Sequence, residues 1–224
     1  MALVVEKPIR SSAEPARRLA ILRAATEEFA LKGYAGARTE GIARAAGVNH
    51  TLVFYHFKTK EQLYHEVLGE IFSEWFERVS RALDSKTPAR ERLLAYVDSY
   101  FDFVAEYPLA PKLVQQEQLR QGSQGSERLR RMAEPYIRPV QRKLATLLKE
   151  GISSGEFRDL DVEHCIHSIS ALVVFYFTNN LAVESLEGVD LCPQRRIKAR
   201  RKAVLDFVSK ALFTVTSGRG SRKA

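Results

Sequence analysis

Apolar residues recur at intervals of three and four along nearly the whole chain, and no stretch alternates apolar and polar residues as a half-buried strand does. The first predicted helix runs from 15 to 32, and its apolar stripe consists of Leu19, Leu22, Ala25 and Phe29. Gly33 follows directly and is a residue that commonly ends helices. This periodicity predicts an all-α protein of about nine helices.

Residues that commonly cap the N-terminus of a helix predict three helices after the first. Thr39 is a candidate cap for a short helix over 41–46, which Gly47 ends. Asn49 is a candidate cap for a second short helix over 50–57, and Thr59 opens a long helix that reaches 83. The chain from 38 to 60 is therefore predicted to contain two short helices joined by a glycine turn.

Five further helices are predicted, over 88–106, 112–120, 127–150, 162–184 and 194–215. Pro135 and Pro139 predict a kink or break in the helix over 127–150. The glycine- and serine-rich stretch 122–126 predicts a flexible turn, and 151–159 predicts a loop.

Charge is unevenly distributed over the 224 residues. Residues 1–60 hold 10 basic and 5 acidic side chains, residues 61–192 hold 15 and 21, and residues 193–224 hold 10 and 1. The three net charges are +5, −6 and +9, which give +8 for the chain. Basic ends around an acidic middle predict that a polyanion is met by a terminal segment.

Two cysteines, Cys165 and Cys192, provide no disulfide framework for a chain of this length, which is typical of a reducing cytosol. The most apolar run, 165–177, is 13 residues long, whereas a bilayer requires ~20. The N-terminal apolar stretch is too short for a signal-peptide core. The sequence predicts a cytoplasmic protein without a membrane partner.

Two short helices around a glycine turn, with a long helix on either side, are typical of a helix-turn-helix over 38–57. The same spacing occurs in bundles that bind no DNA, so it leaves both readings open. The second short helix, HTLVFYHF, favours DNA. Core packing accounts for Val53 and Phe57, but it leaves four hydrogen-bonding side chains unexplained: His50, Thr51, Tyr55 and His56.

The stretch 21–68 resembles the DNA-binding domain of the TetR family of repressors. That family's pattern has a helix ending F-x-x-x-G-Y/F, then T-x-x-I-A-x-x-A-G-V, an aromatic recognition helix and F-x-x-K-E-x-L. Its fixed positions are present here as Phe29, Gly33, Tyr34, Thr39, Ile42, Ala43, Ala46, Gly47, Val48, Phe54, Tyr55, His56, Phe57, Lys60, Glu61 and Leu63. Phe54 departs from the family's usual tyrosine and so lacks a hydroxyl for a phosphate.

The resemblance implies a role for each position of the DNA-reading surface. Thr39, Asn49, His56 and Lys60 would hold phosphates. His50, Thr51 and Tyr55 would face base edges, and Leu52 would contact a thymine methyl.

The resemblance also implies a transcriptional regulator, commonly a repressor, that binds a palindromic operator in double-stranded DNA as a homodimer and is released by a small, largely apolar ligand. The implied organisation is a flexible arm over 1–14, a DNA-binding domain over 15–75, a larger helical ligand-binding and dimerisation domain over 76–216 and a disordered basic tail over 217–224. Arg10, Arg17, Arg18 and the basic run 195–202 either add phosphate contacts or form solvated surfaces.

Inward-facing residues of the larger domain supply the ligand-site candidates, for which ordinary core or dimer packing is the competing explanation. These candidates are Tyr96, Tyr100, Phe103, Gln115, His167, Phe175, Tyr176 and Asn179. His164 and His167 lie beside Cys165, but no second group completes a metal site, so we predict neither a metal nor a cofactor.

Two other classes of protein remain as alternatives. An enzyme is disfavoured because no phosphate-binding loop, nucleophile motif or zinc motif is present. A helical lipid- or small-molecule-binding protein without DNA binding would explain the apolar C-terminal helices, but it leaves residues 39–60 unexplained.

Overall fold

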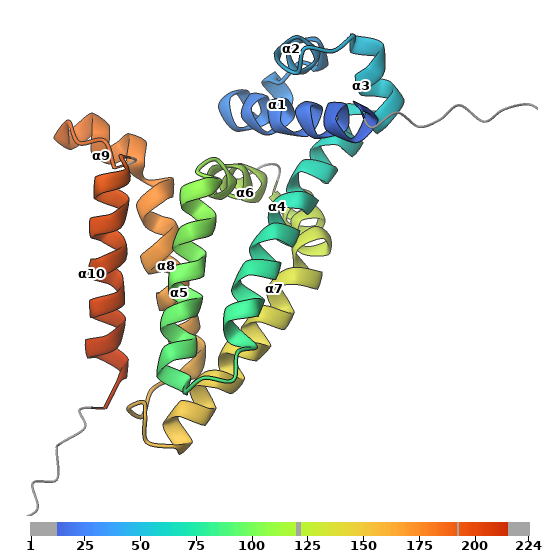
Figure 1. Ribbon diagram of the computed structural model, residues 1–224. Coiled ribbons are helices and arrows are strands. Elements are labelled where there is room, and N and C mark those ends of the chain that lie inside the picture. Colours follow the sequence, from blue (N-terminus) through green and yellow to red (C-terminus); the bar gives the residue numbers. More distant parts are fainter. Residues whose placement is uncertain (1–12, 120–121, 192, 215–224) are drawn as a thin grey trace, which may run out of the picture. The chain divides into compact units, whose positions relative to one another are not determined.

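A computed structural model describes residues 13–119, 122–191 and 193–214, which form ten α-helices (Figure 1). The helices are α1 (Ala13–Gly36), α2 (Thr39–Ala45), α3 (His50–Phe57), α4 (Lys60–Leu83), α5 (Ala89–Glu106), α6 (Ala110–Leu119), α7 (Gly122–Ser153), α8 (Val162–Thr178), α9 (Asn180–Glu187) and α10 (Gln194–Leu212). Within the described residues, the one extended pairing is an isolated β-bridge between Phe157 and Phe213. The predicted all-α class is confirmed.

The chain divides into two compact units, Met1–Glu70 and Ile71–Ala224, whereas the sequence placed the boundary after residue 75. The predicted arm over 1–14 lies outside the described residues except for its last two, and the predicted tail over 217–224 lies wholly outside them. None of the described helices has the length and apolarity that a bilayer crossing requires.

The first unit packs α1, α2, α3 and the start of α4 around an apolar core. Its fully buried members are Ile21, Ala25, Phe29, Ile42, Val53, Phe57, Leu63, Val67 and Leu68. Leu19, predicted to belong to the inner stripe of α1, is 49% exposed, and Ile21 is buried instead. Gly33 has a positive φ of 68°, so the expected end of the first helix is a break within α1.

The second unit contains the rest of α4 and α5 to α10. α5 packs against α7, α8 and α10, and α8 also packs against α6, α7 and α10. Apolar side chains of α5, α7 and α8 point between these helices, including Leu93, Val97, Leu144, Ile169 and Val173.

The tenth helix arises because the helix predicted over 162–184 is divided at Asn179. Asn179 ends α8, and its side-chain amide donates to the Phe175 carbonyl at 3.0 Å. A side chain that bonds to the backbone in this way competes with continuation of the helix. The predicted cap at Asp161 is confirmed, since its carboxylate accepts from the His164 N–H at 2.9 Å.

The turn predicted over 122–126 is wrong, because this stretch is the start of α7. The helix continues through Pro135 and Pro139, so of the predicted kink or break, the break does not occur. Each residue added to an existing helix gains a backbone hydrogen bond, and this outweighs the cost of about 1 kcal/mol of placing a glycine in a helix. Burial of Ala133, Val140 and Leu144 also holds the helix together across its two prolines.

The end of α10 is held against the loop after α7. The Arg90 guanidinium donates to the backbone carbonyls of Glu156 and Thr214, at 3.0 and 2.6 Å. The rings of Phe157 and Phe213 stack with centroids 5.4 Å apart. The two residues that follow α10, Phe213 and Thr214, are therefore fixed to the second unit.

Candidate DNA-binding surface and ligand cavity

The turn between α2 and α3 is a Schellman motif centred on Gly47. The Val48 N–H donates to the Ala43 carbonyl at 3.0 Å, and the Gly47 N–H donates to the Arg44 carbonyl at 3.2 Å. Gly47 has a φ of 66°, which a residue with a Cβ rarely adopts. The prediction that Gly47 ends the second helix is confirmed.

A polar side chain caps α3 but not α2. Asn49 caps α3 as predicted, because its Oδ1 accepts from the Thr51 N–H at 2.9 Å. Thr39 is not the cap of α2. Arg38 occupies that position without a side-chain bond, and the Thr39 hydroxyl instead lies 2.9 Å from Nε2 of His50. The two short helices are thus joined at their N-terminal ends.

Side chains of α3 range from fully buried to exposed. Val53 and Phe57 are buried, as the sequence analysis expected. Thr51 is exposed, Leu52 is half-buried, and Tyr55 is 61% exposed. The α3 surface is therefore aromatic and hydroxyl-bearing and carries no acidic group.

The remaining candidates flank this surface. The His56 ring is half-buried beside Tyr55, with ring centroids 5.2 Å apart. The Lys60 ammonium lies 4.8 Å from the centroid of the Tyr34 ring and 3.5 Å from the Ala35 carbonyl oxygen, both near the end of α1. The His50 ring packs edge-on against Phe54 at 4.9 Å, so this ring is partly engaged within the protein.

Glu28 on α1, which the sequence analysis did not identify, positions the start of α2. Its Oε1 accepts from the Lys32 ammonium at 2.8 Å and from the Arg38 N–H at 3.2 Å. A Cβ at Gly41 would lie 3.0 Å from the same oxygen, so α2 approaches this carboxylate closely. The hydrogen bond from Lys32, followed by that from Arg38, lowers the pKa of Glu28 against the opposing effect of burial.

Replacing Glu28 with Gln is expected to lower the free energy of unfolding by about 1 kcal/mol at pH 7. Because the folded-state pKa of Glu28 lies below its usual value of 4.5, the stabilisation is present above that pH and is lost as the pH falls through the lowered pKa. Thermal unfolding of the parent protein and of the Glu28→Gln variant at pH 7 and pH 3.5 measures this pH-dependent difference in stability. A difference in stability that stays constant between the two pH values would contradict the assignment.

Several candidate basic contacts to DNA are engaged within the protein. Arg18 forms an ion pair with Glu66 and lies over the Phe57 ring. In the run 195–202, Arg200 donates to the Leu172 carbonyl at 2.9 Å, and Arg201 forms ion pairs with two aspartates of α5. Arg10 lies outside the described residues.

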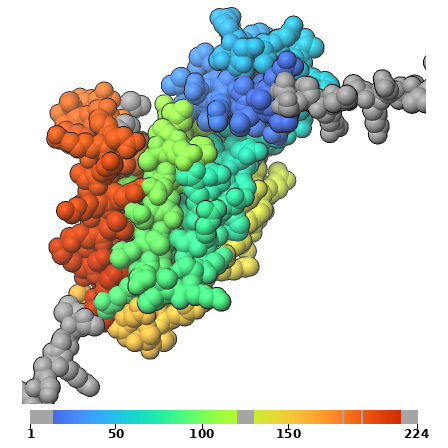
Figure 2. Space-filling model, in the orientation of Figure 1, coloured from blue at the N-terminus to red at the C-terminus, as the bar shows by residue number. Residues whose placement is uncertain are grey.

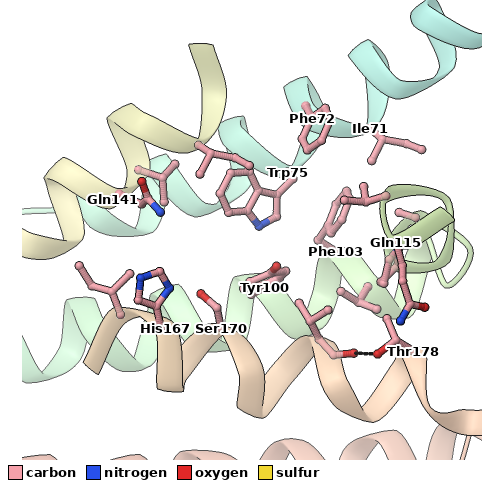
Figure 3. Close-up of a pocket in the computed structure, with 18 of the residues that line it drawn as sticks. Ile71, Phe72, Trp75, Tyr100, Phe103, Gln115, Gln141, His167, Ser170 and Thr178 are labelled. Atoms are coloured by element: carbon pink, nitrogen blue, oxygen red, sulfur yellow. Dashed lines mark hydrogen bonds between the residues drawn. The ribbon is translucent and has the colours of Figure 1, made fainter. Parts of the chain in front are cut away.

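A cavity of about 450 Å³ lies within the second unit, between α4, α5, α6, α7 and α8 (Figure 3). Five of the eight ligand candidates line it: Tyr96, Tyr100, Phe103, Gln115 and His167. Aromatic rings form much of the wall and pack on one another. The ring centroids of Trp75 and Tyr100 lie 5.7 Å apart, and those of Tyr96 and Tyr100 lie 6.2 Å apart. Its size is within the range of small-molecule sites.

The other three candidates lie elsewhere. Phe175 is 65% exposed, the Tyr176 hydroxyl donates to the Leu191 carbonyl at 3.0 Å, and Asn179 ends α8. Conversely, α4, α7 and α8 contribute lining residues that were not predicted, among them Trp75, Gln141 and Ser170. Trp75 belongs to a buried helical stripe, and nothing in that pattern distinguishes core from cavity wall.

Two tyrosines supply hydroxyl groups to the cavity. Burial raises the pKa of Tyr96 to about 12, against the opposing effect of a hydrogen bond with Ser170. Burial also raises the pKa of Tyr100, and the neighbouring Tyr96 adds to this. Both phenols therefore remain neutral hydrogen-bonding groups at physiological pH.

Comparison with known families matches both units. A family described as bacterial regulatory proteins of the tetR family matches residues 21–67, and the tetracyclin repressor-like C-terminal domain matches residues 90–208.

Individual relatives give the same assignment. The HTH-type transcriptional repressor NicS of Pseudomonas putida is 29% identical over 78% of this chain and 82% of its own length. The fatty acid metabolism regulator protein of Bacillus subtilis is 31% identical over 63% of this chain and 72% of its own. Crystalline FadR from Bacillus subtilis, in complex with stearoyl-CoA, superposes with a TM-score of 0.64 at 26% identity, over 85% of this chain and 96% of FadR. The chain belongs to the TetR family of DNA-binding transcriptional regulators.

Proposed function

We propose that this regulator is a repressor that binds a palindromic operator as a homodimer and is released by a ligand in the cavity of the second unit. The first unit reads DNA, and the second binds the ligand and pairs with a second copy. The observation that carries the proposal is the α3 surface, which combines a capped N-terminus, two buried anchors and exposed Thr51 and Tyr55.

The geometry supports two kinds of DNA contact on this surface, to base edges and to phosphates. Thr51, Tyr55, Leu52 and the accessible edge of His50 face base edges. Phosphate contacts come from Thr39, Asn49, His56 and Lys60 around them. Because the Thr39 hydroxyl contacts His50, this pair of side chains holds α2 against α3 when both helices lie on the duplex.

Dimerisation is supported by the uncovered faces of α8 and α10. Phe175 is 65% exposed and Phe207 is 58% exposed, although both lie on helices whose other faces are buried. Figure 2 shows α10 (red) along an open edge of the second unit. A second copy that covers these faces would remove apolar surface from water and place two α3 helices on successive major grooves, ~34 Å apart.

The test of this proposal is capture of fragmented genomic DNA on the full-length protein at moderate salt, followed by sequencing. Enrichment of one or a few palindromes, with half-sites one helical turn apart, is the expected result. Fragments retained without sequence preference, or none retained, would contradict it. The neighbouring genes, assayed for transcription in a strain lacking the regulator, then distinguish repression from activation.

A further inference from the structure

The ligand cavity shares part of its lining with a surface groove between α7 and α8. Gln141, Ile166 and His167 line the cavity, and the same three residues line the groove. Figure 3 shows Gln141 and His167 facing each other at one end of the cavity, with Gln115 and Thr178 at the other. Gln141 and His167 are both exposed, so this end of the cavity, its mouth, borders solvent and the groove.

The described walls of the cavity contain no Asp, Glu, Lys or Arg, and their titratable members are His167 and the two tyrosines, Tyr96 and Tyr100. Burying an uncompensated charge against such walls is strongly unfavourable. A negative charge on the ligand would therefore lie outside the mouth, in the groove.

The groove outside the mouth is basic. Arg138, Arg142 and Lys149 line it from α7, at spacings of four and seven residues that place them on one face of the helix. Among the described residues that line the groove, Glu163 is the one acidic side chain. This concentration of cations runs against the local trend, because residues 61–192 hold 15 basic and 21 acidic side chains.

We infer that the effector is an amphipathic anion, with an apolar body inside the cavity and a carboxylate or phosphate group in the groove that Arg138, Arg142 and Lys149 line. This rests on the proposed function, because it names the chemistry of the ligand that the second unit binds. The aromatic walls would also suit a cationic ligand through cation–π contacts. The three cations at the mouth oppose such a ligand and favour an anion.

A series of dodecyl compounds that differ only in the head group tests the inference. The probes are dodecanol, dodecyltrimethylammonium, dodecanoate and dodecyl phosphate, each below its micelle concentration. Trp75 is the only tryptophan of the protein and lines the cavity, so its fluorescence reports occupancy directly. We expect the two anions to bind at least tenfold more tightly than dodecanol, and the cation to bind most weakly.

A double variant, Arg142→Gln with Lys149→Gln, removes two of the three cations. Both side chains are exposed, and Arg138 keeps its ion pair with Glu134. The matched control, Arg81→Gln with Lys86→Gln, makes the same change in net charge at exposed positions outside the cavity and the groove. The groove variant should weaken anion binding about tenfold and leave dodecanol binding unchanged, while the control changes neither.

Dodecanol binding as tightly as the anions, a preference for the cation, or no binding of any probe would each overturn the inference. So would an equal loss of anion affinity in the two double variants. Tighter binding of dodecyl phosphate than of dodecanoate would identify a phosphate-bearing ligand, and the reverse a free carboxylate. Failure of the proposed function is separate, because it would appear as loss of palindrome enrichment in the genomic capture whatever the order of head groups.

Discussion

Replacing Tyr55 with Ala is expected to weaken operator binding about 100-fold and to relax the base preference at the positions the ring contacts. One good base contact contributes ~1–3 kcal/mol, and a homodimer loses the contact in both half-sites. The side chain is 61% exposed, and its neighbours are the ring of His56 and the ammonium of Lys58. Fluorescence anisotropy with an operator recovered from genomic capture measures the change.

The control is Leu31→Ala on α1, another large side chain of the first unit that is 68% exposed. It should leave operator affinity and the melting temperature unchanged. Circular dichroism should show both variants folded to the same extent as the parent protein. Unaltered operator affinity in the Tyr55 variant would remove α3 from its proposed place in the major groove.

Replacing Gly151 with Ala is expected to lower the free energy of unfolding by about 2–3 kcal/mol. A Cβ at this position would lie 2.3 Å from the nearest atom of the Phe157 ring. That ring is 2% exposed and stacks on Phe213, so it cannot move aside without breaking the contact that fixes the end of α10. Overpacking of this kind outweighs the intrinsic helical preference for alanine.

Gly69→Ala is the matched control, because it makes the same substitution inside a helix with no atom within 4 Å of the new Cβ. It should raise the free energy of unfolding by about 1 kcal/mol. Urea unfolding followed by circular dichroism compares the two. A Gly151 variant as stable as the Gly69 variant would show that the Phe157 ring has room to yield.

Local signals explain why so much of the first unit could be predicted from the sequence. Asn49 and Gly47 act within two or three residues of their own position, so their roles are readable from neighbouring residues. The contact between Thr39 and His50 joins segments 11 residues apart, and the bond from Arg38 to Glu28 joins segments 10 residues apart. No periodic pattern encodes such pairings.

The second unit was less predictable because packing overrides local preference there. Helical periodicity places residues toward the interior, but it does not distinguish a cavity wall from a filled core. Phe175 therefore looked as inward-facing as Phe103, although the first is exposed and the second lines the cavity. The division of the long helix at Asn179 depends on one side-chain hydrogen bond, which an apolar stripe does not reveal.

Coupling between the cavity and the operator site is tested most directly by one titration. Dodecanoate or dodecyl phosphate, whichever binds more tightly, is titrated against the full-length protein with and without saturating operator duplex, with Trp75 fluorescence as the readout. Because coupling between two sites is reciprocal, a ligand that releases DNA must bind the DNA complex more weakly, by about 5- to 150-fold. Equal affinity for free and operator-bound protein would contradict a ligand-released regulator.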